Sequence, residues 1–386
     1  MVIDDKERER TKVVLTKPLS LNEESDSDYG APNLLQRLLS LFKNVRPGSD
    51  LTSFQLPPLF NFPKSHLQCY GESVYSISSD MLSKCSKAET PIDRFIAVVG
   101  WSISTLRPLT FGVAPYNPVL GETHHVSRGN LHVLLEQVSH HPPVSALHAT
   151  DEKENIELIW THHAVPKFYG TSVETEVHGR RQLNLLTRNE TYEMNSPKLL
   201  IRFLPFPGVD WVGNVKICCH ETGLEADLSF RATSFLGLRK SHRSVKGKIH
   251  HRSSPNNPLF EINGNWDRTV TAKDVNNGGI TVIFDAKEAL TGLKTPAVKD
   301  LKGVWRGESA AVWGEVSEGI MRGDWKKARE AKMAVEEKQR EMMREREGRG
   351  QTWVPKHFSL SCSKDGVWEC CPLQKWVPPA PIVSPI

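Results

Sequence analysis

Two adjacent histidines, His140 and His141, lie near the end of the segment EQVSHHPP at residues 136–143. Imidazole N–H groups are good donors to phosphate oxygens, and two rings at a bend can be aimed at one anion. Neighbouring side chains on a continuous strand point to opposite faces, which argues against a shared metal ion. Adjacent histidines by themselves are weak evidence of a function, because the chain contains three other such pairs: His124-His125, His162-His163 and His250-His251. The histidine pair therefore indicates phosphate binding, and we expect neither a metal ion nor a cofactor.

A second set of charged residues occurs in the run from 324 to 347, which is rich in helix-forming residues with opposite charges three and four positions apart. Lys332, Glu336 and Arg340 recur every four residues and therefore share one helical face. Two cations with a carboxylate between them can donate charge-assisted hydrogen bonds to a phosphate. The alternative is a solvated face held by ion pairs, which is what most such runs are.

The segment that must position the histidines is a long series of strands. Residues 111–287 consist of short runs with alternating or β-branched apolar residues, separated by Gly, Asn, Asp and Pro. This pattern predicts a mainly β fold, an antiparallel sheet that closes into a large β-barrel, and large barrels can hold a ligand inside. Because Pro142 and Pro143 cannot continue a central ladder, we expect the histidine pair at a strand end, at the mouth of the barrel.

The N-terminal part predicts a cover for that mouth. Residues 1–30 are charged and predict a disordered tail. Leucines recur at helical spacing after Asn33, a plausible N-cap, and the proline-broken apolar stretch 51–63 predicts an extended strap. We interpret residues 31–63 as a helical lid whose apolar residues Leu51, Phe54 and Leu56 contact the ligand or simply pack in the core.

Helices are predicted on both sides of the barrel. Residues 74–108 contain two helical segments, the second opening with Thr90 as N-cap and Pro91 in the first turn. A further helical region is predicted at 296–350, closed by Gly348 and Gly350. Residues 351–386 are rich in proline and predict irregular coil, so that 31–386 form one domain after the tail.

Composition narrows the class of protein. The chain has 386 residues with a net charge of +4, which is too small a bias to indicate a nucleic-acid partner. The longest apolar stretches are too short to cross a bilayer, and the start lacks the apolar core of a secretory signal. Seven cysteines without a C-x-x-C spacing fit reduced thiols. We therefore expect a cytoplasmic protein that contacts endoplasmic-reticulum or other membranes peripherally and transiently.

The segment EQVSHHPP resembles the signature of the oxysterol-binding-protein-related family. The block Asn117-Pro118-Val119-Leu120-Gly121-Glu122 and the stretches at 221–224, 264–267 and 353–355 are also similar to that family. Without a preceding pleckstrin-homology domain, the sequence resembles the short members of the family. The residues around Asn117 are similar to those of plant members. The resemblance implies a large, near-complete antiparallel β-barrel with a central hydrophobic tunnel, closed by the N-terminal lid. It also implies a non-enzymatic carrier of a sterol or similar lipid, with phosphatidylinositol 4-phosphate as counter-ligand.

The same resemblance implies the residues of the headgroup site. They are His140, His141, Asn117, Glu122, Lys332, Glu336 and Arg340. One departure is Ala114, where family members with strong phosphoinositide binding commonly have lysine. A missing ammonium removes one charge-assisted contact, which weakens the headgroup site or shifts the role to another base. The candidates for that base are His124, Lys216 and Arg107.

Two other functions stay open at this point. A lipid hydrolase would need a G-x-S-x-G elbow or a metal-ligand spacing, and the sequence has neither. The second alternative is a sensor or scaffold at membrane contacts, which binds lipid but transfers little of it. For it, residues 282–288 faintly resemble the acidic-tract motif that docks on endoplasmic-reticulum receptor proteins. The sequence leaves the cargo, the two membranes and the oligomeric state undetermined.

Overall fold

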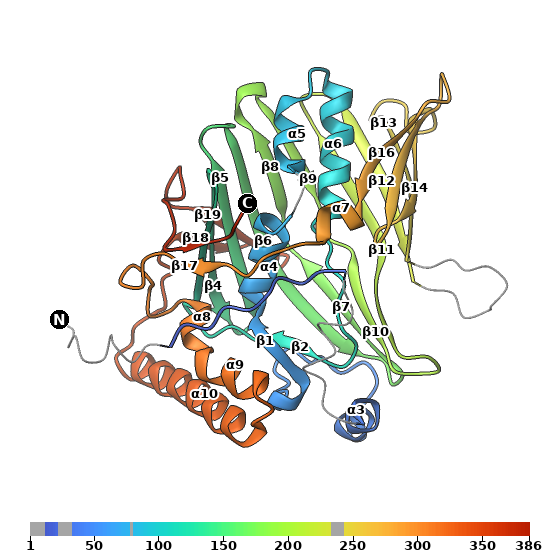
Figure 1. Ribbon diagram of the computed structural model, residues 1–386. Helices are drawn as coiled ribbons and strands as arrows, with labels where there is room; N and C mark the ends of the chain where they lie inside the picture. The colour runs from blue at the N-terminus through green and yellow to red at the C-terminus, as the bar shows by residue number, and fades with distance from the viewer. Residues whose placement is uncertain (1–11, 22–32, 78–79, 233–242) are drawn as a thin grey trace.

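The computed structural model describes residues 12–21, 33–77, 80–232 and 243–386. Within these residues, one strongly curved sheet of sixteen strands forms the body of the protein, and helices pack against it from both ends of the chain (Figure 1). Most strands pair with their neighbours in sequence and run antiparallel, because short turns connect them. The predicted antiparallel architecture is confirmed, apart from the parallel pair of β20 with β3.

The main sheet follows the order β16-β15-β14-β13-β12-β11-β10-β7-β6-β5-β4-β3-β20-β17, and β8 and β9 bridge β6 and β11. Its strands are β3 (Thr123–Arg128), β4 (Leu131–His140), β5 (Pro143–Asp151), β6 (Ile156–Phe168), β7 (Ser172–His178), β8 (Arg181–Leu185), β9 (Glu190–Met194), β10 (Lys198–Arg202), β11 (Gly208–Cys219), β12 (Leu224–Arg231), β13 (Ser244–His251), β14 (Pro258–Asn265), β15 (Thr269–Asp274), β16 (Ile280–Asp285), β17 (Ala297–Val298) and β20 (Ile382–Val383). Two small sheets are also present: β1 (Asn61–Ser65) with β2 (Ala114–Tyr116), and β18 (Phe358–Cys362) with β19 (Trp368–Pro372).

The helices are α3 (Leu34–Phe42), α4 (His66–Tyr75), α5 (Met81–Lys87), α6 (Pro91–Ser104), α7 (Ala286–Leu290), α8 (Ser309–Val312), α9 (Gly314–Met321) and α10 (Trp325–Gly348), with 3-10 turns at Pro58–Phe60 and Leu186–Arg188. Thr90 caps α6 as predicted, since its hydroxyl accepts from the backbone N–H of Asp93. Asn33 does not cap α3, because its backbone is left-handed and its side chain makes no capping bond.

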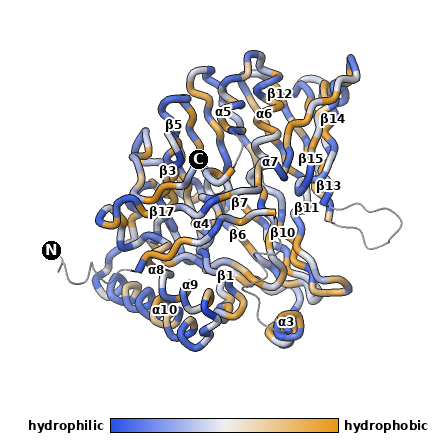
Figure 2. Tube along the Cα trace, in the orientation of Figure 1, coloured by the Kyte–Doolittle hydropathy of each residue, from blue (hydrophilic) through white to orange (hydrophobic). Residues whose placement is uncertain are grey.

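The main hydrophobic core lies between α4–α6 and the concave face of the sheet, where apolar residues follow the strands (Figure 2). Among its members, Trp101, Phe95 and Trp160 are almost completely buried. The backbone of α6 touches the edge strand β16, where a Cβ at Gly100 would lie 2.3 Å from the carbonyl of Ile283. Helix α6 therefore packs on the outermost strand, at the open side of the sheet.

Both chain ends are more ordered than the sequence predicts. Residues 12–21 lie within the predicted disordered tail, yet they are packed, with Leu19 and Thr16 buried. Lys64 Nζ donates to Thr16 O at 3.2 Å, and Glu72 accepts from the Leu19 N–H. The rest of the tail, 1–11 and 22–30, lies outside the described residues.

The predicted C-terminal coil at 351–386 is also corrected. It contains the β18–β19 hairpin, which covers the outer face of β4 and β5 through Phe358 and Cys370, and the strand β20. Sequence reasoning missed these strands because single proline-flanked pairs only become stable on a neighbouring sheet.

The segment at 282–288, which faintly resembles an acidic-tract motif, is part of the folded domain. It forms the end of β16 and the start of α7, with Phe284 and Ala286 buried in the core. A receptor that bound the whole segment in an extended form would require these two residues to leave the core, and docking on an endoplasmic-reticulum receptor stays a prediction.

Two structural features are absent from the described residues. None of the helices there is both long and apolar enough to cross a membrane. No cluster of three or more His, Cys, Asp or Glu side chains is placed to hold a metal ion in the same residues.

Candidate functional site

The histidine pair lies in the turn that joins β4 to β5, where His140 is opposite Pro143. The two rings are edge to face with centroids 4.5 Å apart, and His141 is exposed. His140 Nδ1 lies 3.1 Å from the carbonyl oxygen of Pro118. Since a carbonyl can only accept, Nδ1 carries the proton, and Nε2 is left for a ligand.

Burial, together with the neighbouring His141, lowers the pKa of His140 to about 4. The ring is therefore neutral near pH 7. A neutral ring protonated at Nδ1 offers only a lone pair at Nε2, so it cannot donate to an anion from that atom. Donation to a phosphate from Nε2 requires the imidazolium form.

Asn117 is exposed in the loop between β2 and β3, directly before Pro118. The loop is tied to β4 by the hydrogen bonds from Gly121 N to Gln137 O and from Gln137 N to Glu122 O. The contact of His140 with Pro118 places Asn117 next to the histidine turn. This proximity agrees with the shared site implied by the family resemblance.

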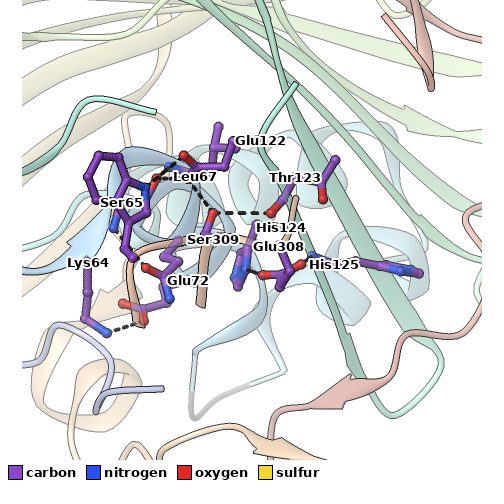
Figure 3. Close-up of polar contacts among 12 residues, drawn as sticks. Lys64, Ser65, Leu67, Glu72, Glu122, Thr123, His124, His125, Glu308 and Ser309 are labelled. Carbon is purple, nitrogen blue, oxygen red and sulfur yellow. Dashed lines mark hydrogen bonds and ion pairs between the residues drawn. The ribbon is translucent and has the colours of Figure 1, made fainter. Parts of the chain in front are cut away.

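Glu122 has a different position from the one expected. Its side chain is completely buried and accepts four hydrogen bonds, from the hydroxyls of Ser65 and Ser309, the Val119 N–H and the Trp313 indole. Figure 3 shows Glu122 with Ser65 and Ser309. Burial raises the pKa of its carboxyl group, against the effect of these donors. Both oxygens are occupied inside the protein, so Glu122 holds the loop together and is not a headgroup ligand.

Lys332 lies on the buried face of α10 and is 10% exposed at its side chain. Its ammonium donates to the carbonyl oxygen of Leu56 and, at 2.8 Å, to Asn61 Oδ1. Burial lowers its pKa to about 8. Asn61 in turn donates from Nδ2 to the carbonyl oxygen of Ala114 at 3.0 Å. Lys332 therefore reaches β2, three residues before Asn117.

The other two residues of the four-residue pattern are less buried. Glu336 Oε1 lies 3.9 Å from Lys332 Nζ, whereas Arg340 is exposed and pairs with Glu337. The predicted bridge from Glu336 to Arg340 is thus replaced by a pair three residues apart. On the same face, Val335 and Ala331 pack with Tyr116 and Trp313, which anchors the middle of α10 beside β2.

None of the three bases considered as substitutes for a lysine at position 114 lies in this site. His124 is buried between Tyr75 and Glu308, and Arg107 donates to backbone carbonyls, among them those of Ser104 and Ser76. Lys216 on β11 pairs with Glu225 on β12. The nearest substitute is Lys332, because Asn61 links it to Ala114.

Two residues beside this site were given no role by the sequence analysis. Asn61 is a buried amide that joins Lys332 to β2, and its signal was a polar residue within the apolar run of residues 56–63. Trp353 lies against Gly121, where a Cβ would be 2.5 Å from the indole, and Arg346 stacks on its outer side. A positive φ at Gly121 and this close approach explain why only glycine fits there.

The predicted lid covers the ends of β6, β7 and β10. Phe42 of α3 stacks on Phe168 and Phe203 with centroids 5.0 and 5.4 Å apart. Leu51 is buried in the same cluster, and Phe54 and Leu56 are partly buried against it. The lid residues thus form a separate apolar cluster beside the residues that the sequence predicts for the headgroup site.

A polar group lies inside the sheet. Arg181 is buried over the ring of Trp160 at 4.2 Å and donates to the hydroxyl of Thr105 at 2.8 Å. His162 packs against Trp160 and Tyr70, and burial lowers its pKa to about 3. Among the described residues, Arg181 Nε, Trp160 Nε1 and both ring nitrogens of His162 have no hydrogen-bond partner. These atoms could meet the polar end of an enclosed ligand.

Comparisons with known proteins agree with this geometry. A family model described as oxysterol-binding protein matches residues 37–314 and 317–377. Oxysterol-binding protein-related protein 4B of Arabidopsis thaliana is 56% identical over 381 residues, which cover 98% of this chain and 99% of that protein. Protein 4C of the same organism is 57% identical over 378 residues, covering 97% and 99%.

Solved structures show the same fold. The Osh1 ORD domain in complex with cholesterol has a TM-score of 0.74 and 22% identity, covering 95% of this chain and 91% of that chain. The Osh3 ORD of Saccharomyces cerevisiae in complex with PI(4)P has a TM-score of 0.69 and 22% identity, covering 95% of both chains. At this identity the likeness extends to the fold alone.

Proposed function

The chain belongs to the oxysterol-binding protein family, and on this basis we propose that it is a lipid carrier. It encloses one sterol-like lipid at a time and exchanges it between membranes for phosphatidylinositol 4-phosphate. The single observation that carries the proposal is the convergence of His140, Asn117 and Lys332 on the ends of β2 and β4, next to the apolar lid. We place its work in the cytoplasm, at membrane surfaces.

The headgroup chemistry follows from the donors at this site. The phosphate oxygens would accept hydrogen bonds from the exposed His141, from Nε2 of His140 and from the amide of Asn117 on one side. On the other side they would accept from the ammonium group of Lys332. Lys332 now donates to the Leu56 carbonyl of the strap, so a bound phosphate and the strap compete for the same ammonium. Capture of a headgroup would therefore loosen the strap at Leu56.

The sterol-like cargo would occupy the interior between the lid cluster and the group around Trp160. Burial of a few hundred Å² of apolar surface contributes several kcal/mol at about 25 cal/mol per Å². The unpaired N–H of Arg181 supplies a donor for a hydroxyl or carbonyl oxygen of the cargo. Carriage of a lipid involves no chemical step, in agreement with the family match and the fold, which are those of lipid-binding domains.

Transfer between two vesicle populations tests the proposal. We expect the purified protein to move fluorescent sterol from donor to acceptor vesicles, and to do so faster when the acceptors contain phosphatidylinositol 4-phosphate. A sensor or scaffold would bind both lipids with little net movement. Mass spectrometry of lipids that co-purify with the protein would identify the cargo class.

Lys332→Met should weaken phosphoinositide extraction by about one order of magnitude or more, because a charge-assisted hydrogen bond contributes about 1.5–3 kcal/mol. Methionine keeps the buried stem but removes the donors to Leu56 and Asn61. Hydrogen exchange of the strap at 51–60 should become faster in the same variant. Extraction from vesicles and exchange mass spectrometry measure the two effects.

Lys338→Met is the matched control, because Lys338 is exposed on the same helix. It should leave extraction and strap exchange unchanged. Equal behaviour of the two variants would remove Lys332 from the headgroup site.

A further inference from the structure

Three large apolar side chains are exposed together at one end of the protein. Phe206 is 62%, Tyr169 49% and Leu204 45% exposed. Tyr169 lies in the turn from β6 to β7, whereas Leu204 and Phe206 lie in the turn from β10 to β11. The two turns adjoin, since the N–H groups of Phe203 and Leu204 both donate to the carbonyl oxygen of Thr171. Single exposed hydrophobic residues are common, but a cluster on adjoining turns indicates a binding surface.

These turns are joined directly to the lid. Phe203, which precedes Leu204, stacks on Phe42 of α3, and so does Phe168, which precedes Tyr169. After α3, the Gly48 N–H donates to the carbonyl oxygen of Phe168. Figure 1 shows α3 at the same end of the molecule as the lower ends of β7 and β10. Whatever binds the turns therefore also meets the lid.

The charges beside the turns are basic. Lys43 and Arg46 are exposed at the end of α3, and Pro47 lies against Gly170, where a Cβ would be 3.7 Å from its ring. Neither Lys43 nor Arg46 has a carboxylate partner among the described residues. Of the nearby carboxylates, Asp210 pairs with Arg202, whereas Asp50 accepts from the Thr52 N–H and meets Lys167 only through a backbone bridge.

We propose that Tyr169, Leu204 and Phe206, with Lys43 and Arg46, form the surface by which this protein docks on an anionic lipid bilayer. Apolar side chains on protruding turns suit a soft bilayer, into which they can insert, with tyrosine at the interface. The basic pair beside them fits anionic headgroups. This proposal rests on the proposed function and adds where the membrane is met: at the lid, so that the bilayer contacts the element that must open.

The test compares vesicle binding by full-length variants. Leu204→Ser with Phe206→Ser should bind vesicles of phosphatidylcholine and phosphatidylserine at least tenfold more weakly than the parent. Lys43→Gln with Arg46→Gln should lose about fivefold per charge on these vesicles and little on pure phosphatidylcholine. Ile280→Ser with Val282→Ser is the control, because these residues are 68% and 58% exposed on β16, at the other end of the sheet.

The docking proposal is overturned if the turn variant binds vesicles as tightly as the control, as it would if the surface served a protein partner. Sterol uptake from cyclodextrin, which needs no bilayer, separates this result from a failure of the proposed function. The turn variant should take up sterol normally in that assay. A parent protein that takes up no sterol from either source would refute the carrier function, whereas the vesicle comparison would still report on docking.

Discussion

Replacing His140 and His141 together by alanine should lower phosphoinositide extraction at least a hundredfold and leave sterol binding nearly unchanged. Each lost charge-assisted bond costs about 1.5–3 kcal/mol, and the two losses together exceed two orders of magnitude in affinity. The pair lies in the β4–β5 turn, apart from the lid cluster and from the group around Trp160. Extraction from vesicles and sterol uptake from cyclodextrin are the two measurements.

The parent protein should also bind phosphoinositide more tightly as the pH falls from about 8 to about 7, where a phosphomonoester with a second pKa of about 6 keeps most of its second charge. The free pKa of His140 is about 4, and a phosphate at Nε2 would raise it. Between the free and the bound pKa, binding takes up a proton, so affinity decreases with rising pH. His140→Ala should flatten this dependence. Equal loss of sterol and phosphoinositide in a folded double mutant would show that the two sites are not separate.

Glu122→Leu should reduce the free energy of unfolding by about 3–5 kcal/mol. It removes the acceptor of four donors inside the protein and leaves the indole N–H of Trp313 and the backbone N–H of Val119 unsatisfied. These donors come from the chain before the sheet, from the β2–β3 loop and from the helices after the sheet, so one carboxylate joins three parts of the fold. Denaturant unfolding measures the loss.

Glu122→Gln is the matched substitution and should cost about 1 kcal/mol or less. Its amide oxygen can accept from Val119 and Trp313, while its NH₂ group faces the hydroxyls of Ser65 and Ser309, which can rotate to accept. A large loss for both variants would mean that the negative charge itself is needed. A small loss for Glu122→Leu would contradict the anchoring role.

Local patterns in the sequence determined much of the fold. Alternating apolar residues between 111 and 287 predicted the strands, and the prolines after His141 placed the histidine pair at a strand end. Thr90 predicted the start of α6 because a cap depends only on the next three residues. Periodicity does not show which distant residues lie together. The family signature supplied that prediction for the headgroup site.

The tertiary structure decided what pairs of distant residues do. Glu122 lies in a block that the family resemblance assigned to the headgroup site, but Ser65, Ser309 and Trp313 surround it and make it a structural anchor. Lys332 and Arg340 are equivalent in the four-residue pattern, yet packing buries Lys332 against Leu56 and leaves Arg340 in solvent. Residues 12–21 resemble a disordered tail in the sequence because the residues that order them, Lys64 and Glu72, lie more than forty positions away. Such contacts depend on which surfaces the folded chain brings together, and no local spacing encodes them.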